Sequence, residues 1–178
     1  MKRLFFGIET LSPWPENYPK GRLIKESDRH LTLCFLGNVP WETMQKLLPS
    51  FPVPKLPLSV CGIFDKPLFL PESNPRVISW HIHSFNERVK SLQEEISSWL
   101  RAAGFSIDQR PFLPDVTIAR SPFSIDEWKN SFTILPMTTG AIHLYESLGG
   151  VNYTPIWSYP LLPPFQEIGH TADIAHGK

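Results

Sequence analysis

The chain has 178 residues, which suits one domain or two small lobes that share a core. It carries 17 basic and 17 acidic residues, so its formal net charge is zero. This balance argues against extensive binding to a nucleic-acid backbone but permits a local phosphate site. With only two cysteines and no apolar run near the ~20 residues of a membrane span, we expect a cytoplasmic protein without structural disulfides.

The first half of the chain predicts mainly strands. The apolar residues 4–8 indicate a buried strand, and prolines, glycine and charges in 11–27 indicate a loop. A strand is expected from His30. Residues 41–48 predict a short helix after Pro40, because Met44, Leu47 and Leu48 would share one apolar face. Two further strands are expected at 58–63 and 77–83.

The second half contains the clearest helical pattern. Apolar residues recur at helical spacing from Phe85 to Leu100, which predicts a helix over 85–103. Ser84 and Glu87 resemble a capping box, and Gly104 suits the end of the helix. After it we expect a strand near residue 105, a strand at 116–120, a helical turn at 126–129, and strands at 141–146 and 156–161.

Strands with two interspersed helices predict an α+β fold, in which antiparallel sheets are covered by helices on one side. The order of elements further suggests two related lobes, each contributing one short motif to a shared cleft.

The first motif is His30-Leu-Thr-Leu-Cys-Phe-Leu-Gly37. In a strand, His30 and Thr32 point to the same face, and Leu33 and Phe35 point to the opposite face, where we expect a core. An imidazole beside a hydroxyl can move a proton and bind a phosphate oxygen, so this pair is a candidate site.

A second copy of the pattern occurs at Pro114-Asp-Val-Thr-Ile-Ala-Arg120. Asp115 and Thr117 again share a face, with an acid in place of the imidazole. Arg120 would add positive charge if its side chain reaches the cleft. Strand propensity alone could explain the threonines, and Asp115 and Arg120 could instead be exposed residues at the strand ends.

The two motifs, in a chain of this size, resemble those of the 2H phosphoesterase superfamily, in particular its RNA 2',3'-cyclic phosphodiesterases, also called 2'-5' RNA ligases. The similarity extends over residues 2–162. The similar segments are Arg3-Leu-Phe-Phe-Gly-Ile8, both motifs, Arg110-Pro-Phe-Leu-Pro114, His143-Leu-Tyr-Glu-Ser147, Tyr153-Thr-Pro155 and Tyr159-Pro-Leu161.

The resemblance implies that residues 1–164 form two similar lobes around a central cleft. It also implies a reaction without a metal or other cofactor, in which a cyclic phosphate is opened to a 2'-phosphate. The substrates would be RNA 3' ends or cyclic nucleotides. His30 would donate a proton to the leaving oxygen, and Asp115 would orient or deprotonate the water, although the reverse assignment is open. Thr32, Thr117 and Arg120 would hold the phosphate. We expect a monomer.

The sequence departs from this family at Asp115, where the family pattern has a second histidine. An ordinary aspartate is ionised at neutral pH and is a weak base. His30 could be partly cationic beside Asp115 and would then be a competent general acid. Three outcomes are open: a working His–Asp pair, a slow enzyme, or a noncatalytic module that binds RNA ends or nucleotides. A domain whose cleft faces another protein is a further alternative.

Other residues have two interpretations. His81 and His83 share a strand face and could bind a metal, but no third ligand has suitable spacing, which favours solvent-facing or cleft-wall positions. We expect Cys34 to be a core or wall residue. Tyr145 and Tyr153 could stack on a base, although packing is the simpler role.

The tail, residues 165–178, contains Phe165-Gln-Glu-Ile-Gly-His-Thr-Ala-Asp-Ile174, which resembles the beginning of archease, a small protein that assists an RNA ligase. In that family His170 and Asp173 would fall in the opening motif, and the aspartate is linked to metal binding. A chance match and a remnant of a fusion are both open interpretations.

Overall fold

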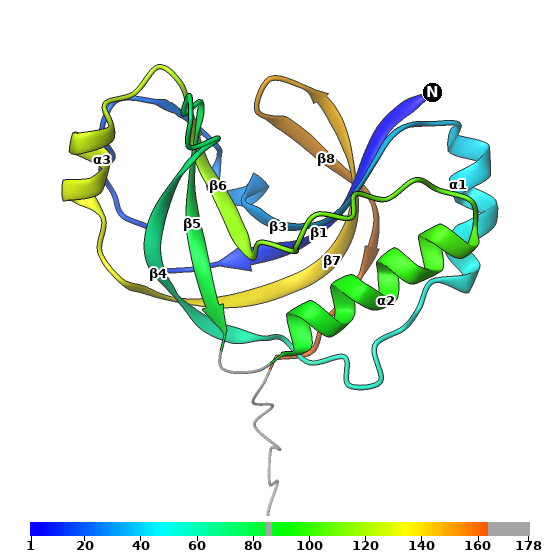
Figure 1. Cartoon of the computed structure of the whole chain (residues 1–178). Helices are drawn as coiled ribbons and strands as arrows, with labels where there is room; N and C mark the ends of the chain where they lie inside the picture. The colour runs from blue at the N-terminus through cyan, green and yellow to red at the C-terminus, as the bar shows by residue number, and fades with distance from the viewer. Residues whose placement is uncertain (85–86, 164–178) are drawn as a thin grey trace, which may run out of the picture.

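A computed structural model describes residues 1–84 and 87–163. Figure 1 shows a curved sheet with helices at its two ends. The strands are β1 (Lys2–Leu11), β2 (Arg22–Leu23), β3 (His30–Val39), β4 (Cys61–Leu70), β5 (Val77–Ser84), β6 (Asp115–Arg120), β7 (Leu135–Gly149) and β8 (Asn152–Tyr159). The helices are α1 (Trp41–Leu47), α2 (Arg88–Ala102) and α3 (Ile125–Ser131), with short 3₁₀ turns at Glu26–Asp28 and Leu48–Ser50.

The strands form one antiparallel sheet in the order β1-β3-β6-β5-β4-β7-β8, and β2 adds to β6. Because β1 also pairs with β7, the path closes on itself. Its narrowest seam is between β3 and β6, where the only register pair is Leu31 with Val116. The two motifs therefore meet at the seam of the sheet.

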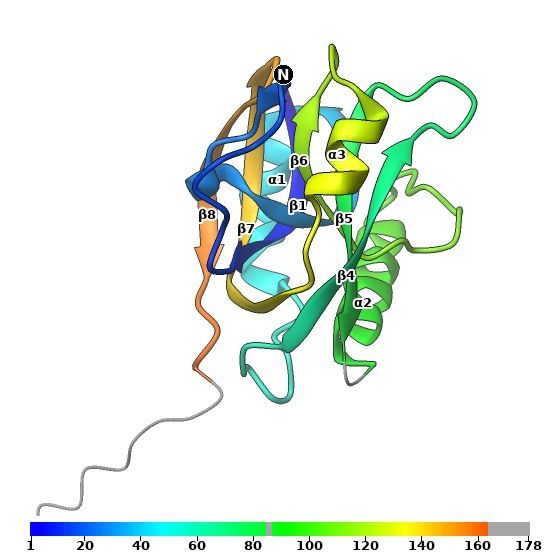
Figure 2. The same ribbon diagram turned by 90° about the vertical axis from the view of Figure 1, so that its left-hand side faces the viewer.

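Helices cover the sheet at opposite ends, as the two views in Figures 1 and 2 show. α2 buries Val89, Ile96 and Leu100, which follow the expected helical spacing. The helix ends before Gly104, whose φ of +89° favours glycine. The α+β class with antiparallel strands is confirmed.

Two details of the predicted α2 region are wrong. The helix begins at Arg88 and not at residue 85, and its N-cap residue is Glu87, which makes no side-chain capping hydrogen bond. Phe85 lies outside the described residues. The strand expected near Phe105 is also absent, because the Phe105 amide donates to the Leu100 carbonyl at 3.0 Å and so belongs to the turn that ends α2.

Other elements shift at their ends. The strand predicted at 58–63 is β4, which begins at Cys61 and continues to Leu70; Leu58 instead forms an isolated bridge with Leu162. The loop expected at 11–27 contains β2. The strand predicted at 141–146 is extended at both ends as β7, whereas the strand predicted at 156–161 is β8, which begins earlier, at Asn152, and ends earlier, at Tyr159. The strand at the first motif and the short helices α1 and α3 are confirmed.

The prediction that Phe35 is a core residue is wrong. Its side chain is 61% exposed, whereas Leu33 and Cys34 are both buried. The cause is a bulge in β3: neighbouring β1 residues Phe6 and Gly7 pair with Cys34 and Thr32, so Leu33 is an extra residue. A bulge reverses the alternation of side chains, which brings Phe35 to the same side as Thr32.

The described residues contain no helix long and apolar enough to cross a membrane. The division into two similar lobes stays a prediction, since the strands of both halves join one continuous sheet. The archease-like segment at 165–178 lies outside the described residues.

Candidate functional site

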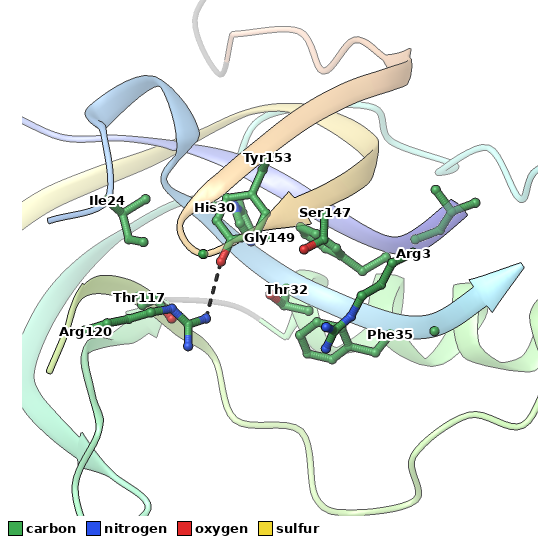
Figure 3. Close-up of a pocket in the computed structure, with 14 residues that line it drawn as sticks. Arg3, Ile24, His30, Thr32, Phe35, Thr117, Arg120, Ser147, Gly149 and Tyr153 are labelled. Atoms are coloured by element: carbon green, nitrogen blue, oxygen red, sulfur yellow. Dashed lines mark hydrogen bonds between the residues drawn. The ribbon is translucent and has the colours of Figure 1, made fainter. Parts of the chain in front are cut away.

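A cavity of about 410 Å³ opens beside the seam between β3 and β6. Four of the five site residues predicted from the sequence line it, as Figure 3 shows: His30, Thr32, Thr117 and Arg120. The first two lie on β3 and the other two on β6. Short motifs from distant parts of the chain are therefore brought together by the sheet.

The fifth predicted residue, Asp115, lines a second cavity of about 690 Å³. The two cavities adjoin, because Thr32, Phe35 and Thr117 line both of them. His30 belongs only to the smaller cavity and Asp115 only to the larger one. The imidazole and the carboxyl group thus flank a junction that carries the two threonines.

The strand register explains this arrangement. Leu31 pairs with Val116 in an antiparallel ladder, so the next residue of β3, Thr32, lies across from the preceding residue of β6, Asp115. By the same alternation His30 lies toward Thr117. Each motif therefore places its hydroxyl near the acid or base of the other motif.

His30 is enclosed by aromatic rings. The ring centroids of Phe5 and Tyr145 each lie 4.8 Å from its own, and Tyr153 meets it edge-on at 5.0 Å. Gly7 allows this packing, since a Cβ atom there would lie 3.2 Å from both His30 Cδ2 and Tyr145 Cε2. Burial lowers the pKa of His30 to about 4.

The expectation that His30 is partly cationic is therefore wrong at neutral pH. Its Nδ1 atom lies 2.7 Å from the Asp28 carbonyl oxygen, which can only accept a hydrogen bond. Nδ1 consequently carries the proton, and Nε2 keeps a lone pair. This neutral tautomer can accept a proton at Nε2.

Asp115 has a different environment. Burial raises the pKa of its carboxyl group, while a hydrogen bond with Ser79 and the charge of His81 lower it. Ser79 Oγ also lies 3.4 Å from Thr117 Oγ1. The carboxyl group thus belongs to a row of polar side chains across β5 and β6.

Two arginines line the smaller cavity. Arg120 donates from Nη2 to the Tyr153 hydroxyl at 3.3 Å, and its buried Nε has no hydrogen-bond partner within the described residues. Arg3 points into the cavity from the opposite side (Figure 3). Arg3 is not among the site residues predicted from the sequence, although it shares strand parity with Phe5 on β1.

The remaining candidate residues are packed in the core, line the cavity wall or contact other side chains. Tyr145 is buried, which confirms a packing role, whereas Tyr153 lines the smaller cavity. Cys34 is buried, with Sγ 3.0 Å from Ser97 Oγ. His81 Nδ1 lies 2.6 Å from Asp65 Oδ1. Across residues 1–84 and 87–163, no three His, Cys, Asp or Glu side chains are grouped to hold a metal.

No protein-family model matches the chain. It is 31% identical over 104 residues to an RNA 2',3'-cyclic phosphodiesterase of Geobacillus stearothermophilus, covering 54% of the chain and 31% of that protein. An RNA 2',3'-cyclic phosphodiesterase of Methanocaldococcus jannaschii is 29% identical over 133 residues, covering 68% of the chain and 72% of that protein. The chain spans only 31% and 57% of the length of the Geobacillus and Thermotoga maritima relatives.

Solved structures give the same picture of the fold. E. coli LigT in apo form matches with a TM-score of 0.66 at 21% identity, covering 90% of this chain and 98% of that one. A Thermus thermophilus protein, TT0787, matches with a TM-score of 0.66 at 19% identity, covering 92% and 100%. The chain is therefore a distant relative of RNA 2',3'-cyclic phosphodiesterases and has the α+β fold of LigT.

Proposed function

We propose that the protein hydrolyses 2',3'-cyclic phosphate ends of RNA to 2'-phosphates without a metal or other cofactor. One observation carries the proposal: two threonines stand at the junction of two cavities, with a proton acceptor on one side and a carboxyl group on the other. Displacement at phosphorus needs the attacking and leaving oxygens on roughly opposite sides. A phosphate held by Thr32 and Thr117 would meet this requirement.

The neutral state of His30 supports the reverse of the expected roles. His30 Nε2 would take a proton from the attacking water, because Nδ1 already donates to Asp28. Asp115, whose pKa is raised by burial, would give a proton to the leaving ribose oxygen. The water oxygen forms the new bond to phosphorus as the bond from phosphorus to O3' breaks.

Charge on the phosphate would be stabilised from the smaller cavity. Arg120 has an unpartnered buried Nε among the described residues, and Arg3 faces it across the cavity. Guanidinium groups stabilise phosphoryl oxygens as negative charge develops. Tyr153 would position Arg120 through its hydroxyl.

The ligand class is supported by related folds. Structures of E. coli LigT are described as complexes with 3'-AMP, ATP and NADP+. We propose RNA 3' ends or cyclic nucleotides as ligands here, and a monomeric protein in the cytoplasm.

The test is incubation of the protein with chelator and a short RNA that ends in a 2',3'-cyclic phosphate. The expected product is the 2'-monophosphate. Measurable RNA binding without turnover would instead favour a noncatalytic module, and failure to bind any phosphorylated ligand would indicate a protein-binding domain.

A matched pair of variants tests the placement of the phosphate. Thr32→Val removes one proposed hydrogen bond to a charged oxygen and should lower kcat/KM by about 10- to 100-fold. Thr43→Val makes the same change on the exposed surface of α1 and should leave the rate unchanged. Equal rates for the two variants would contradict the proposed phosphate position.

A further inference from the structure

Three neighbouring strands place a row of ionisable side chains behind Asp115. His81 on β5 is the register partner of Asp115 on β6. Partners in an antiparallel ladder present side chains on the same face, with Cβ atoms ~5 Å apart. β4 lies on the other side of β5, as Figure 1 shows, and supplies Asp65.

A bulge in β4 explains the position of Asp65. Phe64 and Lys66 pair with the successive residues Ile82 and His81, which leaves Asp65 as the extra residue. Its carboxylate lies 2.6 Å from His81 Nδ1. Because a carboxylate accepts hydrogen bonds, His81 Nδ1 is the donor in this contact, and the contact orients the imidazole ring.

The pair is connected both to the site and to solvent. The charge of His81 acts on Asp115, which itself lines the larger cavity. His81 and Asp65 are each partly exposed, at 19% and 30% of their side chains, so protons can exchange with water there. Other charged groups also lie near His81 and Asp115. They are Lys66, the register partner of His81, and the Asp108–Arg110 ion pair, which lines the larger cavity.

We propose that His81, oriented by Asp65, is a positioning residue that supplies the proton which Asp115 gives to the leaving oxygen. The inference rests on the proposed function. Asp115 loses its proton to O3' as the P–O3' bond breaks, and then takes a proton from the His81 imidazolium. His81 recovers its proton from water. An imidazole on the neighbouring strand thus acts where the family pattern has one on β6.

The test compares His81→Gln with His83→Gln, a substitution of the same kind two residues along β5. We expect His81→Gln to lower kcat by at least about tenfold at neutral pH. It should also change the alkaline limb of the pH–rate profile, because the return of a proton to Asp115 would no longer pass through residue 81. His83→Gln should keep the wild-type rate and profile.

A second background separates positioning from a merely structural role. In an Asp115→Asn protein, His81→Gln should have no further effect on kcat, because His81 acts through Asp115. Asp65→Asn should shift the same limb of the profile, and it replaces His81→Gln if that variant does not fold.

The outcomes are distinct. No turnover by the wild-type protein would overturn both the proposed function and this inference. Turnover with the same pH profile in the wild type and in His81→Gln would overturn the inference alone. The inference would also be overturned if His81→Gln lowered kcat as much in the Asp115→Asn background as in the wild type.

Discussion

The two sides of the junction share a strand motif but differ in chemistry. On the β3 side, His30 is enclosed by aromatic rings, and burial lowers its pKa to about 4. On the β6 side, Asp115 lies among Ser79 and His81, and burial raises its pKa. The same spacing of an ionisable residue and a threonine therefore yields a neutral base on one side and a carboxyl group shifted toward its acid form on the other.

This difference indicates that burial determines which group suits the base role and which suits the acid role. Burial disfavours the charged form of either group, so it makes a histidine a better acceptor at neutral pH and an aspartate a better donor. Groups whose environments shift their pKa values in opposite directions are suited to acid and base roles in one reaction.

The largest effect is expected from His30→Gln. The glutamine cannot accept a proton as an imidazole does, so kcat should fall by about 10²- to 10⁴-fold. Steady-state turnover of cyclic-phosphate RNA measures it, with circular dichroism to establish that the variant is folded. A fall of less than about tenfold in a folded variant would remove His30 from the proposed base role.

The β3 side should also make stability depend on pH. Below its ordinary pKa of 6.5, His30 takes up a proton in the unfolded chain but not in the folded one, down to about pH 4. The free energy of unfolding should therefore decrease as the pH falls through this range, by on the order of 3 kcal/mol.

Urea unfolding at several pH values, compared with His30→Gln, isolates this contribution. The variant should lack the decrease due to His30, whereas Asp115 contributes equally to both proteins and with the opposite sign, because its pKa is raised. Parallel curves for the two proteins would show that His30 is not held in its neutral form.

Asp115→His tests whether the β6 side is adapted or degenerate. The new imidazole would meet the same burial, which disfavours its charged form, so it would be a poor proton donor. We expect kcat to fall by about tenfold. An increase in kcat would mean that the site gains from the family's histidine, and it would contradict the role given to Asp115 and His81.

The smallest effect concerns the bulge that shapes the junction. Phe35 is 61% exposed, so Phe35→Ser should change the free energy of unfolding by less than about 0.5 kcal/mol. Leu33→Ala, at a buried position two residues earlier in β3, should cost about 2–5 kcal/mol. Similar losses for both variants would indicate that Phe35 is a core residue, and hence that the bulge is absent.

Local patterns were sufficient to predict much of the fold. The strand from His30 and the apolar face of α2 depend on residues close in sequence, and the structure contains both. The place of Phe35 was mispredicted because strict alternation holds only in an unbulged strand, and a bulge depends on the partner strand β1.

The candidate site was predicted only in part, because some of its features depend on neighbouring strands. Motif spacing and family resemblance indicated His30, Thr32, Thr117 and Arg120, and the structure brings these four residues to one cavity. The neutral state of His30 depends on rings from β1, β7 and β8, and the neighbours of Asp115 come from β5. Such pairings across the sheet leave no local signal in the sequence.

The most direct test of the phosphate position is a crystal structure of the protein with a nucleoside 2'-monophosphate. We expect phosphate oxygens within hydrogen-bond distance of Thr32 Oγ1 and Thr117 Oγ1, with His30 and Asp115 on opposite sides of the phosphorus. A phosphate bound elsewhere, or one contacted by neither threonine, would contradict it.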